Sequence, residues 1–564
     1  VNASYTGTSS SRANPFVMLS GRETTEDTGD CYGFNLVYSG NHYEAVEVNS
    51  YGKTRFVSGI NPQNFCWKLP AGESFEAPEA VMAYSRAGYN GMSQCMHRFV
   101  REHIVRGAWK KKVRPVLLNS WEAAYFDINE KKLLQLAKAG KEAGIELFVM
   151  DDGWFGHRYA DNSSLGDWFV DRRKLPHGLS ELAKEIHKRG MKFGLWFEPE
   201  MTNKDSDLYR AHPDWILHTP GRNTSHGRYQ YVLDFSRKEV VEYIYEMMAK
   251  ILSEAKVSYI KWDMNRCMSE VYSSIHDHQS QGKVMHEYIL GVYRLYTILT
   301  EKYPDILFES CASGGARFDP GMFYYAPQCW TSDDTDAIER LKIQYGTSLV
   351  YPLSSMGSHV SAIPNHQTFR NTPLETRANV AYFGTFGYEL DVNQLTFEEK
   401  EIIDKDLIVK IPNNLKKEQK VVLRKHVLNT VTIYNPKEIK LSENQIKLRD
   451  KIQDKKFIEA DGTFSLEDVA YALSDTKKPI DMKVLRNGEI VKLNTIYPNK
   501  QGLMGIIYDL KEYLVPITNV KTAFKASYDY LYDQTKAMLI TLKQLFTGKI
   551  PLKNMHGVVL VTKI

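Results

Sequence analysis

The sequence predicts an α/β protein whose central domain is an eight-stranded (β/α)8 barrel, a TIM barrel. Three observations support this prediction. Residues 111–400 contain eight apolar, β-branched or aromatic segments of strand length, the composition of strands buried on both faces of a parallel sheet. Segments with the helical period separate most of them, which favours parallel pairing with right-handed crossovers. Most of the eight segments end in polar or aromatic residues, as strands do when their carboxyl ends open into a site.

The region before the barrel, residues 1–110, is predicted to be part of a β-sandwich. Short alternating runs are cut by Gly, Pro and Asn turns, for example in residues 29–41 and 65–72. Residues 88–107 are expected to be a helical connector. The chain begins at Val1 rather than Met, so we expect a fragment that has lost upstream sequence.

The barrel domain is predicted to span residues 111–400. Its strands are predicted at residues 114–121, 145–154, 192–200, 229–235, 257–265, 306–311, 328–333 and 349–353. Helices are predicted between them, for example at residues 130–143, 179–189 and 238–256. The main alternative is a doubly wound open sheet, which no Gly-rich nucleotide-binding loop supports.

The chain after the barrel differs in composition. All nine Trp and all six Cys lie before residue 331, and residues 402–564 carry 28 Lys plus Arg against 18 Asp plus Glu, a net charge of +10. We expect a linker at residues 401–454 and a small α+β domain at residues 455–564.

Three elements are predicted in that last domain. Residues 461–473 have the pattern of a turn followed by a helix. Residues 480–493 predict a β-hairpin, because Asn487-Gly488 is a preferred two-residue turn between alternating strands. Residues 523–546 predict a long helix with Tyr and Leu on one face.

Overall composition excludes several classes of protein. A net charge of +4 is too small to indicate a nucleic-acid partner. No signal peptide opens the chain and no apolar run reaches membrane-spanning length. The cysteines are scattered without a CxxC pair, which favours free thiols in a reducing, cytoplasmic compartment; they are Cys31, Cys66, Cys95, Cys267, Cys311 and Cys329.

Polar residues at the predicted strand ends form one chemically consistent set, because all carboxyl ends of barrel strands face one mouth. The set is Trp121, Asp151, Asp152, Trp154, Trp196, Glu198, Glu200, Arg228, Asp234, Lys261, Asp263, Asn265, Cys311, Gly314, Gly315, Asp333, Asp334 and Asp336. Many carboxylates with several tryptophans suit glycoside chemistry, in which one carboxylate attacks the anomeric carbon and another protonates the leaving oxygen. Lys261 would keep Asp263 ionised, and the acidic neighbours of Asp333 would raise its pKa.

Each of these features also has a structural explanation. An Asp-Asp pair at a strand end is often a helix cap or turn. A Trp in a barrel is often part of the core, and an Asp-rich mouth also suits Mg²⁺ or Ca²⁺. The residues alone leave these alternatives open, and only the agreement of several strand ends favours glycoside chemistry.

Six longer sequence runs allow a more specific interpretation. They are Glu26-Asp-Thr-Gly-Asp-Cys-Tyr-Gly-Phe, Met150-Asp-Asp-Gly-Trp-Phe-Gly, Trp196-Phe-Glu-Pro-Glu-Met, Tyr259-Ile-Lys-Trp-Asp-Met-Asn-Arg, Glu309-Ser-Cys-Ala-Ser-Gly-Gly and Trp330-Thr-Ser-Asp-Asp-Thr-Asp-Ala-Ile-Glu-Arg. In this order, from about Asn14 to Lys400, the chain resembles the family 36 glycoside hydrolases, the bacterial and fungal α-galactosidases.

The resemblance implies a retaining α-galactosidase that uses no metal or other cofactor and acts on raffinose-type or melibiose-type oligosaccharides. It implies that Asp263 is the nucleophile and Asp333 the acid/base. The galactose pocket that it implies consists of Trp121, Asp151, Asp152, Trp196, Arg228, Lys261, Asn265, Cys311 and Gly314. The two Asp of the Asp-Asp-Gly-Trp run are implied to hold the O4 and O6 side of galactose. The Cys311–Gly315 loop is implied to lie near O2, which leaves an α-N-acetylgalactosaminidase open.

Two departures from the family pattern limit the resemblance. The N-terminal region matches only the last part of a larger β-supersandwich that supports a tetramer in many members, so homo-oligomerisation stays open. The family's C-terminal β-sandwich is not recognisable either.

The end of the chain instead resembles the PDZ region of RseP-like site-2 metalloproteases. The runs that carry this resemblance are Phe464-Ser-Leu-Glu-Asp-Val, Asp481-Met-Lys-Val-Leu-Arg-Asn-Gly-Glu and Phe524-Lys-Ala-Ser-Tyr. The His-Glu-x-x-His zinc motif is absent, so no proteolysis is implied. The apolar face of the helix at residues 523–546 suits either a membrane surface or a core.

A second hypothesis is a non-catalytic fusion remnant whose PDZ-like part binds a peptide C-terminus by strand addition. A gene-assembly or truncation artefact is the alternative to a natural fusion. The presence of every expected catalytic residue argues against decay of the barrel.

Overall fold

We describe the protein from a computed structural model. The structure describes residues 1–396, 398–400 and 403, together with the backbone of four short strands further along the chain. The chain forms two compact units, residues 1–414 and residues 415–564, and each is described by itself.

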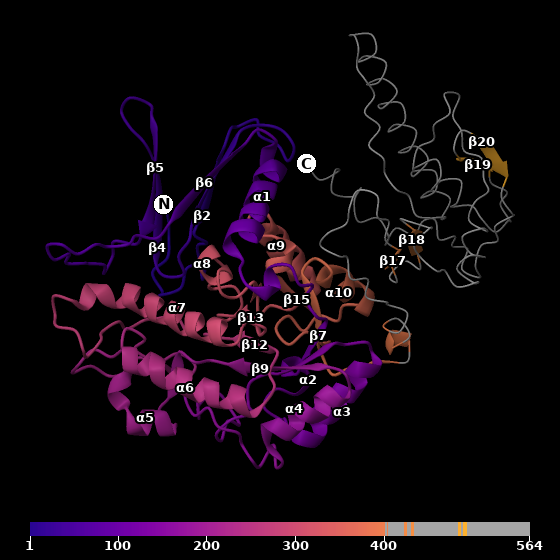
Figure 1. The fold of residues 1–564 in the computed structure, drawn as a ribbon. Helices are drawn as coiled ribbons and strands as arrows, with labels where there is room; N and C mark the ends of the chain where they lie inside the picture. The colour runs from indigo at the N-terminus through magenta and orange to yellow at the C-terminus, as the bar shows by residue number, and fades with distance from the viewer. Residues whose placement is uncertain are drawn as a thin grey trace, which may run out of the picture. The chain divides into compact units, whose positions relative to one another are not determined.

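A closed barrel of eight parallel strands forms the centre of the first unit, which confirms the predicted barrel (Figure 1). Going round the barrel, the strands are β7 (Leu117–Asn119), β8 (Leu147–Met150), β9 (Lys192–Phe197), β12 (Tyr259–Trp262), β13 (Leu307–Ser310), β14 (Gln328–Trp330), β15 (Met356–Ser361) and β16 (Thr385–Glu389). The barrel closes where β16 pairs with β7, with Gly387 opposite Leu117. The strand residues are almost all buried, so the interior is a packed core.

Helices follow most of the strands and cover the outside of the barrel (Figure 1). The longer ones are α3 (Glu130–Glu142), α4 (Gly178–Lys188), α6 (Lys238–Glu254), α7 (Val284–Lys302), α9 (Ala337–Ser348) and α10 (Leu374–Ala381), and the short ones are α2 (Trp121–Ala124), α5 (Asp207–Ala211) and α8 (Pro320–Phe323). In α3, Asn129 accepts the N–H of Lys132 at 3.0 Å and so caps the first turn. Its buried residues include Leu133 and Leu136, three positions apart on one face. The helices predicted at 130–143, 179–189 and 238–256 are therefore confirmed as α3, α4 and α6.

Two of the eight predicted strands are wrong. The segment 229–235 contains β11 (Gln230–Val232), which pairs antiparallel with β10 (Met201–Asn203) outside the barrel. The segment 349–353 contains no strand, and β15 and β16, which complete the barrel, lie further along the chain.

The strands β15 and β16 lack a continuous apolar run because each contains a glycine among polar residues, and large neighbours occupy the space beside both glycines. A Cβ atom on Gly357 of β15 would lie 2.8 Å from the ring of Trp330. A Cβ atom on Gly387 of β16 would lie 2.7 Å from the ring of His359 and 2.9 Å from Leu117. Glycine is needed at both positions, and it removes the hydrophobic pattern by which strands are recognised.

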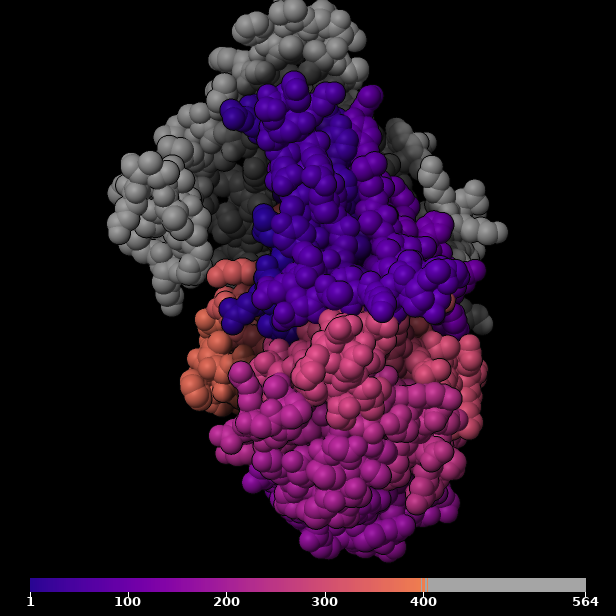
Figure 2. All heavy atoms as spheres, turned by 90° about the vertical axis from the view of Figure 1, so that its left-hand side faces the viewer, coloured from indigo at the N-terminus to yellow at the C-terminus, as the bar shows by residue number. Residues whose placement is uncertain are grey.

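The N-terminal region consists of two three-stranded antiparallel sheets, β1-β4-β5 and β2-β3-β6. Their strands are β1 (Asn2–Ala3), β2 (Phe16–Ser20), β3 (Cys31–Leu36), β4 (His42–Val48), β5 (Thr54–Ile60) and β6 (Ala80–Ser85), followed by α1 (Gly88–Phe99) and a π-helical turn, Val100–Ile104. Phe34 and Phe56 stack between the sheets with ring centroids 3.9 Å apart. Figure 2 shows this indigo region against the pink part of the barrel domain, where Ser9 and Ser39 donate to Asp319 at 2.5 and 2.7 Å.

A buried ion pair ties the barrel to the segment that follows β13. Arg317 donates to both carboxylate oxygens of Glu200, at 2.6 and 3.0 Å, and neither side chain is exposed. Trp262 and Tyr288 donate to the same carboxylate. Removing one partner of such a pair costs about 3–5 kcal/mol, so Glu200 has a structural role.

The second unit is described only through four strands. β17 (Val422–Lys425) pairs antiparallel with β18 (Thr430–Ile433), and β19 (Lys483–Arg486) with β20 (Glu489–Lys492). Arg486 lies opposite Glu489, the register expected of the predicted hairpin. The Asn-Gly turn itself, the helices predicted at 461–473 and 523–546, and the PDZ-like character lie outside the described residues. No helix in the described part of the chain is long and apolar enough to span a membrane.

Candidate active site

The side chains that the sequence predicted for a site lie at the carboxyl ends of neighbouring barrel strands. Asp151 and Asp152 follow β8, and Trp196 belongs to the end of β9. Lys261 is part of β12, and Asp263 is the first residue after that strand. The register places Lys261 of β12 beside Trp196 of β9, so these groups share one mouth.

The carboxylate of Asp263 is buried and held by four donors. Trp196 Nε1 and Asn265 Nδ2 donate to Oδ2 at 3.1 and 2.9 Å, and the backbone N–H of Met264 donates to Oδ1 at 2.8 Å. The thiol of Cys311 also donates to this carboxylate. Burial alone would raise the pKa of Asp263, but the charge of Lys261 and these hydrogen bonds hold it below its usual value. Asp263 is therefore ionised over a wide pH range.

Asp333 has the opposite electrostatic character. It lies in the segment between β14 and α9, and no hydrogen bond reaches its carboxyl group from any described residue. Burial, and next the charge of Asp263, raise its pKa to about 6, against the opposing charges of Lys261 and Arg228. Asp263 and Asp333 also both raise the pKa of the Cys311 thiol, after burial. The charges of both carboxyl groups thus act on one buried thiol; Asp263 is ionised, and Asp333 can carry a proton near neutrality.

Lys261 forms an ion pair within the site. Its Nζ donates to Asp151 at 2.9 Å, and Asn119 donates to the same oxygen at 2.6 Å. Glu389 at the end of β16 is also buried, accepts from His359 at 2.9 Å and acts electrostatically on Lys261 and Asp151. Glu389 was not predicted, because its strand was not recognised.

Asp152 is bound by an arginine that was not predicted either. Arg158 donates through Nε and Nη2 to Asp152 at 2.8–3.2 Å, and its side chain is not exposed. The pairing fixes the orientation of the carboxylate, and a carboxylate with about four acceptor positions still has room for further donors.

Three other predicted residues lie in segments between the barrel strands. Arg228 has a φ of 51° and donates to Asp161 at 3.1 Å, and its charge acts on Asp263 from a side chain that is 41% exposed. Trp121 begins α2 and packs edge-on against Tyr125 with ring centroids 5.2 Å apart. Gly314 forms a bridge with Ser332, directly before Asp333.

Glu198 is a third carboxyl group beside the nucleophile. It is fully buried, accepts the backbone N–H of Asn265 and accepts from Gln230 at 3.0 Å. Burial, and next the charge of Asp263, raise the pKa of Glu198 to about 8. It is therefore protonated where Asp263 is ionised, so the site does not hold two adjacent negative charges.

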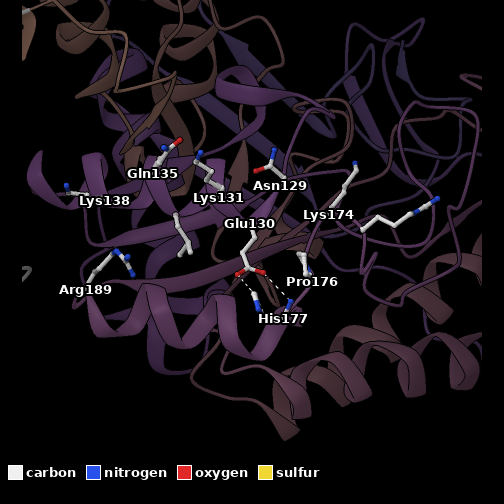
Figure 3. A pocket seen from close by; sticks show the side chains of 11 residues that line it. Asn129, Glu130, Lys131, Gln135, Lys138, Lys174, Pro176, His177 and Arg189 are labelled. Atoms are coloured by element: carbon white, nitrogen blue, oxygen red, sulfur yellow. Dashed lines mark hydrogen bonds and ion pairs between the residues drawn. The ribbon is translucent and has the colours of Figure 1, made fainter.

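One open pocket lies away from this centre, on the outer layer of the barrel (Figure 3). It has a volume of about 570 Å³ and is lined by α3 as far as Lys138, by residues just before α4 and by Arg189 directly after α4; Glu130 pairs there with His177 at 2.8 Å. None of the predicted site residues lines it. Among the described residues, no three His, Cys, Asp or Glu side chains are arranged to hold a metal ion.

Replacing Gly314 by alanine is expected to lower kcat for a substrate of this site by roughly 10- to 100-fold, because misplacing a catalytic group by about 1 Å has this effect. Gly314 has a φ of 82°, and a Cβ atom there would lie 2.7 Å from the backbone nitrogen of Asp333. Steady-state kinetics with a melting curve tests this. The control is Gly346→Ala in α9, where a Cβ atom meets nothing within 4 Å. Equal activity of the two variants would contradict the prediction.

Comparison with known proteins gives consistent results. Residues 74–423 match the Melibiase family model, and residues 1–70 match the model of the glycosyl hydrolase family 36 N-terminal domain. Alpha-galactosidase AgaA of Geobacillus stearothermophilus is 54% identical over 397 residues, which is 70% of this chain and 54% of that protein. Alpha-galactosidase Mel36A of Lactobacillus acidophilus is 53% identical over 407 residues, 72% of this chain and 56% of that protein.

The crystal structure of AgaA matches with a TM-score of 0.70, covering 71% of this chain and 56% of that chain. Variants of AgaA have been solved in complex with raffinose and with stachyose. The chain spans about half the length of the curated relatives it matches.

Proposed function

The chain belongs to glycosyl hydrolase family 36, and we propose that it is an α-galactosidase. The proposed reaction is hydrolysis of terminal non-reducing α-D-galactosyl residues of raffinose-type and melibiose-type oligosaccharides with retention of configuration. One observation carries the proposal: Asp263 directly follows β12 and Asp333 lies between β14 and α9 of the same barrel, and the charge of Asp263 helps to raise the pKa of Asp333 while the pKa of Asp263 itself is held low. This is the division of roles that retaining glycosidases require.

In the proposed mechanism, Asp263 attacks the anomeric carbon while Asp333 gives its proton to the glycosidic oxygen. The aglycone leaves and a β-linked galactosyl–Asp263 ester remains. Asp333, now ionised, takes a proton from water, and the water oxygen attacks the anomeric carbon from the α face. The ester bond breaks, Asp263 leaves as a carboxylate, and α-galactose is released.

In this mechanism the surrounding residues orient the nucleophile and bind the galactose ring. Trp196 and Asn265 hold the carboxylate of Asp263 for attack. Lys261 stabilises its charge, and Asp151 and Asp152 accept hydrogen bonds from the O4 and O6 hydroxyls of galactose. An equatorial O4, as in glucose, would miss these acceptors, and a buried acceptor left without its donor costs about 1–3 kcal/mol.

The test is hydrolysis of melibiose by the purified full chain, followed by proton NMR from the first minute. We expect the α-anomer of free galactose to appear before mutarotation produces the β-anomer. If β-galactose appears first, the reaction inverts and the mechanism is wrong. Faster hydrolysis of α-N-acetylgalactosaminides than of α-galactosides would change the substrate assignment and leave the mechanism intact.

We expect kcat/KM for raffinose to be highest on the acid side of neutrality. Activity requires Asp263 to be ionised, which its lowered pKa secures, and Asp333 to be protonated, which is lost as the pH rises through about 6. The two groups interact, so the profile reports pKa values of the pair. Measuring kcat/KM from pH 3 to pH 9 tests this, and activity that still rises between pH 6 and pH 8 would contradict it.

We also propose that residues 455–564 form a separate PDZ-like unit that binds a peptide C-terminus. The sequence motifs and the antiparallel pairing of β19 with β20 support this proposal. Fluorescence polarisation of labelled peptides with the full chain tests it. We expect binding of peptides with a free C-terminal carboxylate and a loss of binding on amidation; a library without any binder would argue against the unit.

A further inference from the structure

The segment that carries Asp333 is held through its backbone, while no described residue donates a hydrogen bond to the Asp333 carboxyl group. Arg340 donates to the carbonyl oxygens of Ser332 and Asp334, each at 2.6 Å. Gln367 donates through Nε2 to the carbonyl oxygen of Asp333 at 2.8 Å. Three successive carbonyl groups are thus fixed by side chains, so the direction in which Asp333 projects depends on the residues that supply these donors.

The donor to Asp333 belongs to a tight turn after β15. Asn365 is buried, and its Oδ1 accepts the backbone N–H groups of Gln367 and Thr368, both at 3.0 Å. The backbone of Asn365 also exchanges hydrogen bonds with Phe369 and Arg370. These hydrogen bonds fix the backbone of Gln367, from which its side chain reaches Asp333.

One buried carboxylate connects this turn to the Asp333 segment. Glu122 Oε1 accepts from the hydroxyl of Thr335 at 2.6 Å and lies 3.1 Å from Nδ1 of His366. Glu122 Oε2 accepts the backbone N–H of Ala362 at 2.9 Å, where the chain enters the turn. Thr335 in turn accepts from Asn365 Nδ2 at 2.9 Å. The side chain of Glu122 is only 1% exposed, so water does not compete for these bonds.

We propose that Glu122 is a positioning residue for the general acid: it joins Thr335 to the turn of residues 362–370 and so fixes the direction in which Asp333 projects. Among the described residues, Glu122 hydrogen-bonds to Thr335 and Ala362 and pairs with His366. Its charge also acts on Arg340, which holds the carbonyl groups on either side of Asp333. The proposal rests on the proposed function, because it assigns to Asp333 the transfer of a proton to the leaving group.

The expected signature is a loss of activity that depends on the leaving group. A misplaced acid slows departure of a sugar, which needs a proton, and hardly affects 2,4-dinitrophenolate, which leaves without one. A general defect in folding would lower both rates by the same factor. The contrast between the two substrates therefore separates positioning of the acid from a loss of folded protein.

The experiment measures kcat/KM of the full chain and of Glu122→Ala for melibiose and for 2,4-dinitrophenyl α-galactoside. We expect a loss of roughly 10- to 100-fold for melibiose, part of the 10²–10⁴-fold that a general acid supplies. For the activated substrate we expect less than about a threefold loss. The matched control is Glu142→Ala in α3, whose side chain is 69% exposed, and it should behave as the unchanged chain does.

Two further variants keep the test decisive if Glu122→Ala does not fold. Glu122→Gln retains one carbonyl oxygen and should give a weaker effect of the same kind. Gln367→Ala removes the bond to the Asp333 carbonyl from an exposed position, and should show the same contrast between substrates. Equal losses on both substrates, or no loss on either, would overturn the inference. An unchanged chain that hydrolyses neither substrate would instead overturn the proposed function and the inference with it.

Discussion

Replacing Asp263 by alanine is expected to reduce hydrolysis of raffinose by roughly 10⁴- to 10⁶-fold, the scale on which enzymes that form a covalent intermediate lose activity without their nucleophile. The physical reason is that the other residues around Asp263 are donors directed at its charge. Trp196 and Asn265 donate to its carboxylate, and Lys261 holds its pKa low. With the carboxylate removed, they stabilise no group that can attack the anomeric carbon. Steady-state kinetics of purified protein measures the effect.

Chemical rescue distinguishes loss of the nucleophile from loss of the site. Azide should enter the space left in Asp263→Ala and attack an activated α-galactoside from the face that Asp263 occupied. The product is then β-galactosyl azide, with configuration inverted. The control Asp305→Asn changes a carboxylate that is 88% exposed and should keep full activity without azide. Formation of α-galactosyl azide by the alanine variant would contradict the assignment of Asp263.

Much of the fold follows from hydrophobic pattern alone. Six of the eight barrel strands were located, because they are continuous apolar runs buried on both faces. The segment around β11 has the same pattern, since Gln230–Val232 is fully buried although it pairs antiparallel outside the barrel. A hydrophobic pattern indicates that a segment is buried, but it does not indicate which strand a short segment pairs with.

The site residues that the sequence did not predict are held by side-chain contacts, which the hydrophobic pattern does not indicate. Glu389 was missed with its strand, where glycine replaces an apolar residue beside His359. Glu122 directly follows Trp121, but its partner Thr335 is 213 positions further along the chain. Asp152 was predicted to bind sugar, and no local signal indicated that Arg158 binds it as well. Motifs therefore identified the groups proposed to touch the substrate, and the structure was needed to find those that hold them.

Replacing Asp333 by alanine is expected to give a different pattern of loss from the Asp263 variant. Hydrolysis of raffinose should fall by about 10²–10⁴-fold, the usual contribution of general acid catalysis, because the leaving sugar no longer receives a proton. Hydrolysis of 2,4-dinitrophenyl α-galactoside should fall much less in its first step. The decline of kcat/KM above about pH 6 should disappear, since it reports loss of the proton from Asp333.

The configuration of the azide product then distinguishes the roles of the two carboxyl groups. In Asp333→Ala the nucleophile is intact, so the galactosyl–Asp263 ester forms from the activated substrate and accumulates for want of a base to activate water. Azide needs no base and attacks the ester from the α face, which gives α-galactosyl azide, the opposite anomer to that expected from Asp263→Ala. The neighbouring variant Asp334→Asn is the control, because it keeps the side-chain oxygen that accepts the N–H of Asp336 at 3.1 Å. The same anomer from both alanine variants would mean that the two carboxyl groups do not divide the roles of nucleophile and acid, since only attack from opposite faces of the ring gives opposite products.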